Sequence, residues 1–218
     1  MLRSIWGSIS MTTYTLEQSK DIWLVSDFHF GHRNIIAYCN RPFTTVDEMN
    51  ETLLNNYKSV ITEKSLVYFL GDMSFGRQER KEQTCKWWCE QLPGTIVTYI
   101  KGSHDHGIRP TMQVLPKNVQ KILLEDDIEV DEIIFHLEHE PIYRDPQKEY
   151  AYDWLIHGHV HNNRPLFSVS NKSINVSVEA INYTPISLYA LVQKILLLDT
   201  LDNIMDLPLP GNMAERRL

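Results

Sequence analysis

Short apolar runs that end in polar segments organise the first half of the chain. Runs of strand length that are mostly apolar predict buried strands at 22–26, 66–70 and 95–100. The polar segments that follow them read DFHFGH, GDMS and KGSHDH. Because ligands bind at the carboxyl ends of strands in an open α/β sheet, these segments are candidates for a functional site.

Between these strands, the pattern of the residues predicts helices. Thr45 and Glu48 are typical of a capping box, and the pattern after them predicts a helix at about 46–61. Residues 78–92, which end at Pro93-Gly94, favour a second helix. The first half therefore alternates strand and helix.

The second half is richer in strands. Candidate strands lie at 119–124, 133–138, 154–157 and 173–178. Residues 187–198 could form a helix or a long buried strand, and we favour the helix. With no internal repeat or dividing linker, we expect an N-terminal extension over 1–20, one domain over 21–198 and a C-terminal tail over 199–218.

Composition narrows the possible partners. The 218 residues are 43% apolar and 22% charged, as in ordinary soluble domains, and the net charge is -7. Without a run of Lys and Arg, nucleic-acid binding is disfavoured, and a phosphate-bearing substrate would need local cations. The sequence offers no membrane span or signal peptide, and three Cys fit a reducing compartment, so we expect a cytoplasmic protein.

The histidines suggest a metal site. On an extended segment, side chains two residues apart point the same way, so Asp27 with His29 could bind one cation, and His159 with His161 repeats the spacing. Gly158 would let the backbone approach closely. Asp72 and His139 add further donors, and this mixture suits Mn, Fe, Zn or Ni rather than Ca.

Other polar residues near these segments have simpler interpretations. His32 and His157 are expected to support the site through hydrogen bonds rather than to bind metal. Arg41 could bind a substrate phosphate, although a solvated surface Arg is the default expectation. The five Trp residues are dispersed along the chain, which argues against a base-stacking platform.

The ordered motifs resemble the calcineurin-like metallophosphoesterase family, and in particular its small single-domain bacterial and phage members. The family pattern is D-x-H, G-D, G-N-H-D/E, a lone H and G-H-x-H. The matching segments here are Asp27-Phe28-His29, Gly71-Asp72, Gly102-Ser103-His104-Asp105, His139 and Gly158-His159-Val160-His161. The resemblance spans roughly residues 22–185 and implies an α/β/β/α sandwich, a four-layer arrangement of two mixed β-sheets flanked by helices.

The resemblance also assigns roles and a mechanism. One divalent ion, Mn²⁺ first among the candidates, would bind Asp27, His29, Asp72 and His161. A second would bind Asp72, His139 and His159, with Asp72 shared. His104 would contact the phosphoryl oxygen, and Asp105 would orient His104. In-line attack by a metal-bridging hydroxide would then cleave the phosphoester.

Ser103 departs from the family pattern, which has Asn as a ligand of the second metal. A serine hydroxyl is shorter and a poorer ligand, so we expect a weakened second site. The alternatives are an engineered change and a protein that keeps the fold without full catalysis.

The sequence favours a phosphodiesterase, whose substrate could be a nucleotide or cyclic nucleotide. Alternatives are a phosphomonoesterase, a nuclease, and an interaction module with little activity, as in the retromer subunit of this fold. Oligomeric state is left open by the sequence.

Overall fold

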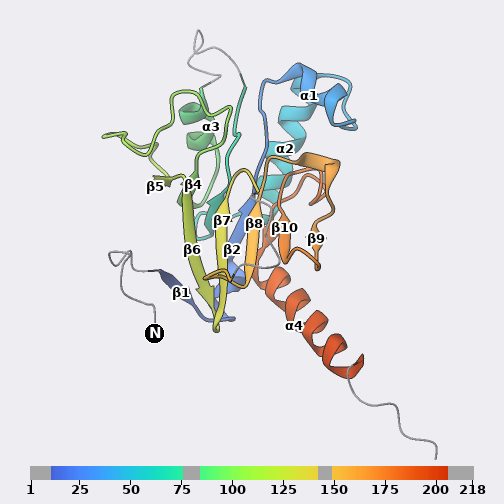
Figure 1. The fold of residues 1–218 in the computed structure, drawn as a ribbon. Helices are drawn as coiled ribbons and strands as arrows, with labels where there is room; N and C mark the ends of the chain where they lie inside the picture. The colour runs from blue at the N-terminus through green and yellow to red at the C-terminus, as the bar shows by residue number, and fades with distance from the viewer. Residues whose placement is uncertain (1–10, 76–83, 142–148, 206–218) are drawn as a thin grey trace, which may run out of the picture.

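A computed structural model describes residues 11–75, 84–141 and 149–205 of the chain. Figure 1 shows two β-sheets at the centre, three helices gathered at one end and a long helix that leaves the body at the other. The helices are α1 (Arg33–Tyr38), α2 (Val46–Val60), α3 (Cys85–Gln91) and α4 (Leu188–Met205), with 3-10 turns at Gln18–Asp21 and His161–Asn163.

Five strands form the first sheet, in the order β11-β2-β3-β4-β5. Its strands are β2 (Ile22–Val25), β3 (Leu66–Phe69), β4 (Thr95–Ile100), β5 (Val119–Leu123) and β11 (Ile186–Ser187). Neighbours from β2 to β5 are parallel, and β11 pairs antiparallel with β2. The buried runs that predicted the first three strands therefore belong to the parallel part of this sheet.

Six strands form the second sheet, in the order β1-β6-β7-β8-β10-β9. Its strands are β1 (Thr12–Tyr14), β6 (Glu125–Val130), β7 (Ile133–Glu138), β8 (Trp154–His157), β9 (Phe167–Ser168) and β10 (Ser173–Asn175). Strands β7, β8 and β10 run parallel to one another, and β1 pairs parallel with β6, whereas β6 pairs antiparallel with β7 and β9 pairs antiparallel with β10. The predicted fold of two mixed sheets flanked by helices is confirmed.

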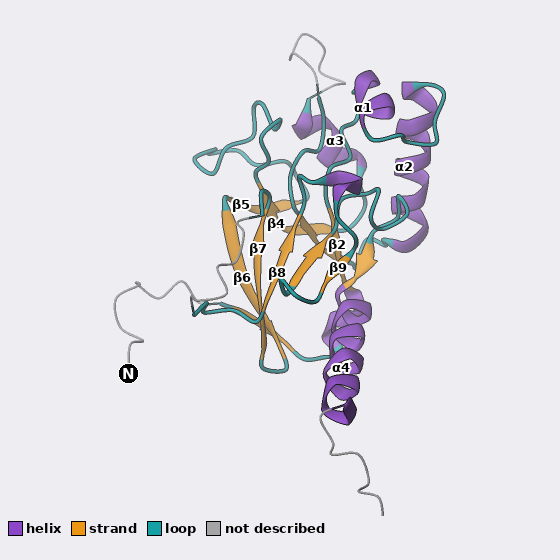
Figure 2. Cartoon of the chain, turned by 45° about the vertical axis from the view of Figure 1, so that its right-hand side comes forward, coloured by secondary structure: helices purple, strands orange, loops and turns teal. Residues whose placement is uncertain are grey.

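Alternating side chains of the five-stranded sheet divide the core into two clusters. Val25 and Phe69 face a cluster with α2 and α3, whereas Leu24 and Leu70 face the second sheet. Buried side chains of α4 belong to this second cluster. The first turns of α4 therefore cover the sheets, and Figure 2 shows the helix continuing away from them. Burial on both faces explains why these strands lack an alternating pattern.

Several boundaries differ from the sequence predictions. Thr45 caps α2 by accepting a hydrogen bond from the Glu48 N–H, as predicted. The second predicted helix is observed as α3, which begins at Cys85, and residues 78–83 of the prediction lie outside the described residues. The prediction missed strands β1, β6, β9 and β11 and helix α1. Strand β1 lies in the predicted extension but pairs with β6 of the domain, and α4 continues past the predicted domain end at 198. The division into domain and tails stays a prediction.

Candidate metal centre

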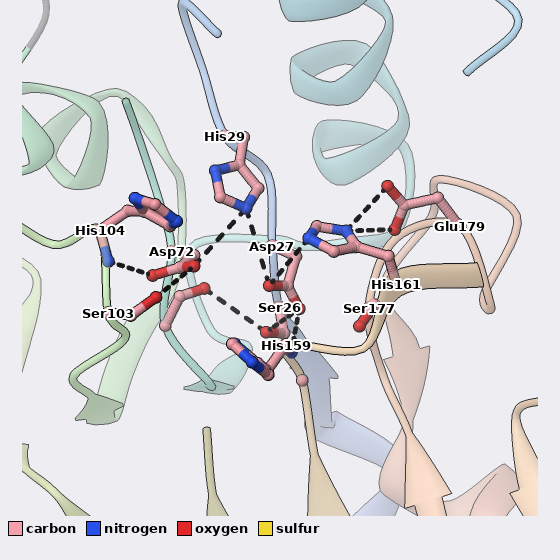
Figure 3. Close-up of polar contacts among 12 residues, drawn as sticks. Ser26, Asp27, His29, Asp72, Ser103, His104, His159, His161, Ser177 and Glu179 are labelled. Carbon is pink, nitrogen blue, oxygen red and sulfur yellow. Dashed lines mark hydrogen bonds and ion pairs between the residues drawn. The ribbon is translucent and has the colours of Figure 1, made fainter. Parts of the chain in front are cut away.

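The candidate site lies where strand ends of both sheets meet. Segments after β2, β3 and β4 reach it from one sheet, and segments after β7, β8 and β10 reach it from the other. A parallel bridge between Ser26 and Ser177 joins the two sheets at this point. The predicted clustering of residues at carboxyl strand ends is therefore seen, with the second sheet supplying the later histidines (Figure 3).

Left-handed backbone conformations mark most of the predicted ligands. Positive φ angles occur at Asp27 (61°), His29 (51°), Asp72 (56°), His159 (68°) and His161 (50°). The expectation that the two-residue spacings lie on extended segments is therefore wrong. Such conformations cost free energy in residues with a Cβ and concentrate at functional sites, where the surrounding structure holds them in place.

Asp27, His29 and His161 form the first compact group of possible ligands. One ligand atom from each lies within 4.8 Å of the others. The Asp27 Oδ1 atom is 3.8 Å from His29 Nε2 and 3.9 Å from His161 Nε2. The other oxygen, Oδ2, accepts hydrogen bonds from the Ser26 hydroxyl and the His159 backbone N–H. This leaves Oδ1 directed between the two imidazoles.

Asp72 connects this group to a second one that contains Asp27 and His139. Its Oδ2 atom is 3.5 Å from His29 Nε2 and 3.3 Å from His139 Nε2. Its Oδ1 atom accepts a hydrogen bond of 2.8 Å from the backbone N–H of His104. Asp72 therefore lies between histidines of both groups, the position that a shared ligand would need.

Unpartnered polar atoms indicate that the pocket fits a cation. Within the described part of the chain, the buried atoms Asp27 Oδ1, His29 Nε2 and His139 Nε2 have no hydrogen-bond partner. Buried polar groups are nearly always paired, so three such atoms facing one another need an explanation. A divalent ion bound by carboxylate and imidazole donors would satisfy all three. The ring orientation agrees, because His139 Nδ1 is already bonded to the Leu70 carbonyl at 2.7 Å.

Burial and the neighbouring polar groups shift the pKa values of the histidines in opposite directions. Burial lowers the pKa of His139, but its contacts with Asp72 and Asp27 raise it overall to about 9. Burial also opposes protonation of His161, yet hydrogen bonds with Cys39 and Glu179 raise its pKa to about 10. For His29, burial prevails and holds the pKa well below its usual value. A bound cation would have to displace protons from His139 and His161.

Glu179 and Arg41 brace His161, a contact that the sequence motifs did not predict. Both Glu179 oxygens lie near His161 Nδ1, at 3.0 and 3.1 Å, which leaves Nε2 pointing into the site. Arg41 binds the Glu179 carboxylate at 2.8 Å and donates to the carbonyls of Asp27 and Phe28. Arg41 is only 4% exposed, so the expectation of a solvated surface residue is wrong. A carboxylate that follows the strand-like run INVSV was the available signal for Glu179.

Asp105 holds the backbone of the site. Its buried carboxylate accepts hydrogen bonds from the backbone N–H groups of Asp72, Met73 and Gly102, at 2.7 to 3.0 Å. The family resemblance assigned Asp105 to orienting the His104 ring. The contacts seen here fix the turns that carry Asp72 and Ser103. The His104 ring lies 5.4 Å from the His29 ring and borders the candidate centre.

His159 and Ser103 are held more loosely than the other predicted ligands. The His159 ring is 5.3 Å from the His139 ring, but His159 belongs to neither compact group and its side chain is 38% exposed. The exposed Ser103 lies 3.4 Å from Asp72 Oδ2 through its hydroxyl. Beside Ser103 and His139 an open depression of about 270 Å³ also presents Lys101.

Two glycines allow the ligand loops to approach each other. A Cβ at Gly71, where φ is +88°, would lie 2.7 Å from His139 Nδ1. A Cβ at Gly158 would lie 2.6 Å from Asp27 Oδ2. The close backbone approach that the sequence predicted at Gly158 is therefore present.

Other predicted support residues lie around the centre. His32 begins α1, where its Nδ1 accepts a hydrogen bond from the Ile35 N–H. His157 is buried and bonded through Nδ1 to the Gly158 carbonyl.

Among the described helices, none has the length and apolarity required to cross a membrane.

Comparison with known proteins gives one relative that covers most of the chain. The chain is 40% identical over 183 residues to "Uncharacterized protein MJ1445" of Methanocaldococcus jannaschii, which covers 81% of this chain and 92% of the relative. No protein-family model matches the chain.

Solved structures provide a comparison of the fold. A protein of unknown function, AQ665 from Aquifex aeolicus, shares 27% identity and a TM-score of 0.59, with 81% of this chain and 98% of that chain covered. Yfce, a phosphoesterase from E. coli, shares 15% identity and a TM-score of 0.39 over 77% of this chain and 81% of its own.

Proposed function

The chain belongs to the family of protein MJ1445 of Methanocaldococcus jannaschii, and we propose that it is a metal-dependent phosphoester hydrolase that prefers phosphodiesters. The single observation that carries this proposal is the convergence of Asp27 Oδ1, His29 Nε2 and His139 Nε2, all buried and unpartnered, around Asp72. Divalent cations held by these imidazoles and carboxylates would neutralise charge at a phosphate.

Two cations would divide these donors. Asp27, His29 and His161 would hold the first, His139 and His159 the second, and Asp72 would be shared. When bound, the cations would neutralise phosphate charge and make a water molecule a better nucleophile. The acidic chain would thereby gain the local positive charge that its net charge of -7 does not provide.

The remaining residues would act on substrate and on the geometry of the centre. The His104 ring borders His29, where it would contact the phosphoryl group and donate a proton to the leaving oxygen. Lys101 lines the open depression and would attract the phosphate. Asp105 would act as a positioning residue, because it holds the turns of Asp72 and Gly102.

Paired model substrates test this function. Protein stripped of metal and then loaded with Mn²⁺ should hydrolyse bis-p-nitrophenyl phosphate faster than p-nitrophenyl phosphate, and a chelator should abolish both reactions. Parallel loading with Fe²⁺, Zn²⁺ and Ni²⁺ ranks the metals. Equal rates with and without metal would refute the proposal, and a preference for the monoester would replace diesterase by phosphatase.

Ser103 favours one second candidate, an interaction module with weak turnover. A serine at this position offers no carboxamide oxygen, so the second cation would bind weakly. Under this alternative, the loaded protein would bind one metal per chain and show no turnover on either substrate, which metal analysis and the same assays would reveal.

A further inference from the structure

Two aromatic side chains remain exposed beside the candidate metal centre. Phe75 is 39% exposed and Tyr38 is 72% exposed. Scattered exposed apolar residues are normal on a protein surface, but these two contact the same histidine. The His32 ring stacks on Phe75 at 3.8 Å between centroids and meets the Tyr38 ring edge-on at 6.2 Å. We call Tyr38, Phe75 and His32 the aromatic wall.

Ring contacts connect the aromatic wall to the centre. The Phe75 ring lies 5.3 Å from the ring of His104, the residue proposed to contact the phosphoryl group. The His32 ring lies 5.6 Å from that of His29, a proposed ligand. A group attached to a phosphate in the centre would therefore reach the wall within the length of a small substrate.

Backbone contacts hold the wall in place. The Phe75 N–H donates to the Phe30 carbonyl at 3.0 Å, next to a parallel bridge between Phe30 and Ser74. The imidazole of His32 caps α1, the helix that ends at Tyr38. Because Phe75 and His32 are fixed before any ligand binds, little ordering would be needed for binding.

We propose that the aromatic wall binds a planar ring of the substrate, so that the preferred substrates are phosphoesters carrying an aryl or nucleobase group. This inference rests on the proposed phosphoesterase function. Stacking on an aromatic side chain tolerates different rings, because every such ring presents a π-face. The sequence argument against a base-stacking platform considered only the Trp residues. It missed this surface because Tyr38 and Phe75 come from separate segments.

Non-hydrolysable phosphonates test the wall without requiring turnover. Calorimetry on the Mn²⁺-loaded protein should give at least about fivefold tighter binding of phenylphosphonate than of methylphosphonate. Cyclohexylphosphonate should gain less, because it matches the size of the phenyl ring but is not planar. The Phe75→Leu variant should lose this preference and bind phenylphosphonate no better than methylphosphonate.

Two controls complete the design. Phe75→Trp should keep the preference for phenylphosphonate. Val169→Ala should leave it unchanged, because Val169 is exposed in the turn before β10, at the strand end opposite the centre. Competition by adenosine 5′-monophosphate against ribose 5-phosphate then tells a nucleobase from a simple aryl group.

The outcomes separate the two proposals. If methylphosphonate and phenylphosphonate bind equally, the aromatic wall is refuted and the phosphoesterase function stands. A preference for phenylphosphonate that survives Phe75→Leu also refutes the wall. If no phosphonate binds in the presence of Mn²⁺, the proposed function fails and the inference fails with it.

Discussion

The two sides of the candidate metal centre differ in how firmly their side chains are held. On the Asp27 side, which comprises Asp27, His29 and His161, the Ser26 hydroxyl fixes the carboxylate and Glu179 fixes His161. Glu179 is itself bound by buried Arg41. Such outer contacts orient a ligand before a metal binds, so under the proposed function the Asp27 side would bind its cation the more tightly of the two.

The Asp72 side comprises Asp72, His139, His159 and Ser103. Asp72 and His139 are buried and hydrogen-bonded, but His159 and Ser103 are at the surface. Fewer contacts would restrain a second cation there. Under the proposed function, one centre would combine a firmly held site with an adjustable one, and occupancy of the adjustable site would limit turnover.

Removing a histidine from each side gives the largest expected contrast. His161→Gln should lower kcat/KM on bis-p-nitrophenyl phosphate about a thousandfold, because it removes a braced ligand of the first metal. His159→Gln should lower it only about tenfold at saturating Mn²⁺, because the other donors of that side remain. Steady-state kinetics with metal analysis measures both, and equal losses would contradict the proposed inequality of the two sides.

Glu179→Gln tests the brace rather than the ligand. We expect metal affinity on the Asp27 side to fall about 10–100-fold, as is typical when a partner of a ligating histidine is lost. Titration of the stripped protein with Mn²⁺ measures this change. Leaving Arg41 buried without its partner also destabilises the fold, by about 3–5 kcal/mol.

A double variant distinguishes these two effects of Glu179→Gln. Combining it with Arg41→Met removes the unpaired charge and should recover part of the stability but not the metal affinity. Recovery of both in the double variant would mean that Glu179 acts only on folding.

Ser103→Asn should strengthen the adjustable side. Ser103 is exposed and lies 3.4 Å from Asp72 Oδ2, so a longer carboxamide has room to supply an oxygen ligand. We expect up to about tenfold tighter binding of the second Mn²⁺, with higher turnover at low metal concentration. Ser103→Ala is the matched control. If Ser103→Asn leaves the affinity for the second Mn²⁺ unchanged, position 103 does not limit binding of that ion.

The sequence predicted the parallel core better than the edges of the fold. Runs such as 66–70 and 95–100 are apolar because both faces are buried, so their hydrophobicity alone identified them. Strand β6 (Glu125–Val130) carries four acidic residues, EDD and Glu129, and was missed for that reason. Its stability comes from pairing with β7 along its whole length, which local sequence does not encode.

The candidate site was also predicted only in part. Motif order identified Asp27, His29, Asp72, His139 and His161, which the structure brings together. The brace of Arg41 and Glu179 could not be inferred, because the two residues are distant in sequence and meet only when the two sheets join. The left-handed backbone at the ligands was also missed, because the spacing alone suggested an extended segment.

Proton linkage gives the smallest expected effect and compares both sides in one experiment. In the metal-free protein the pKa values of His161, on the Asp27 side, and His139, on the Asp72 side, are raised to about 10 and about 9. A raised folded-state pKa contributes stability that is complete below the ordinary value near 6.5 and is lost as the pH rises through the folded-state value.

The melting temperature of metal-free protein in chelator should therefore fall between pH 6.5 and pH 9.5, by a few degrees for each kcal/mol lost. Circular dichroism melts measure the change. In His161→Gln and His139→Gln the fall should be smaller, and the two reductions compare how strongly each side holds its proton. With Mn²⁺ bound, the slope should weaken or reverse, because the cation takes the place of both protons. A pH dependence that is identical in all variants would show that the charges facing these histidines do not stabilise the fold.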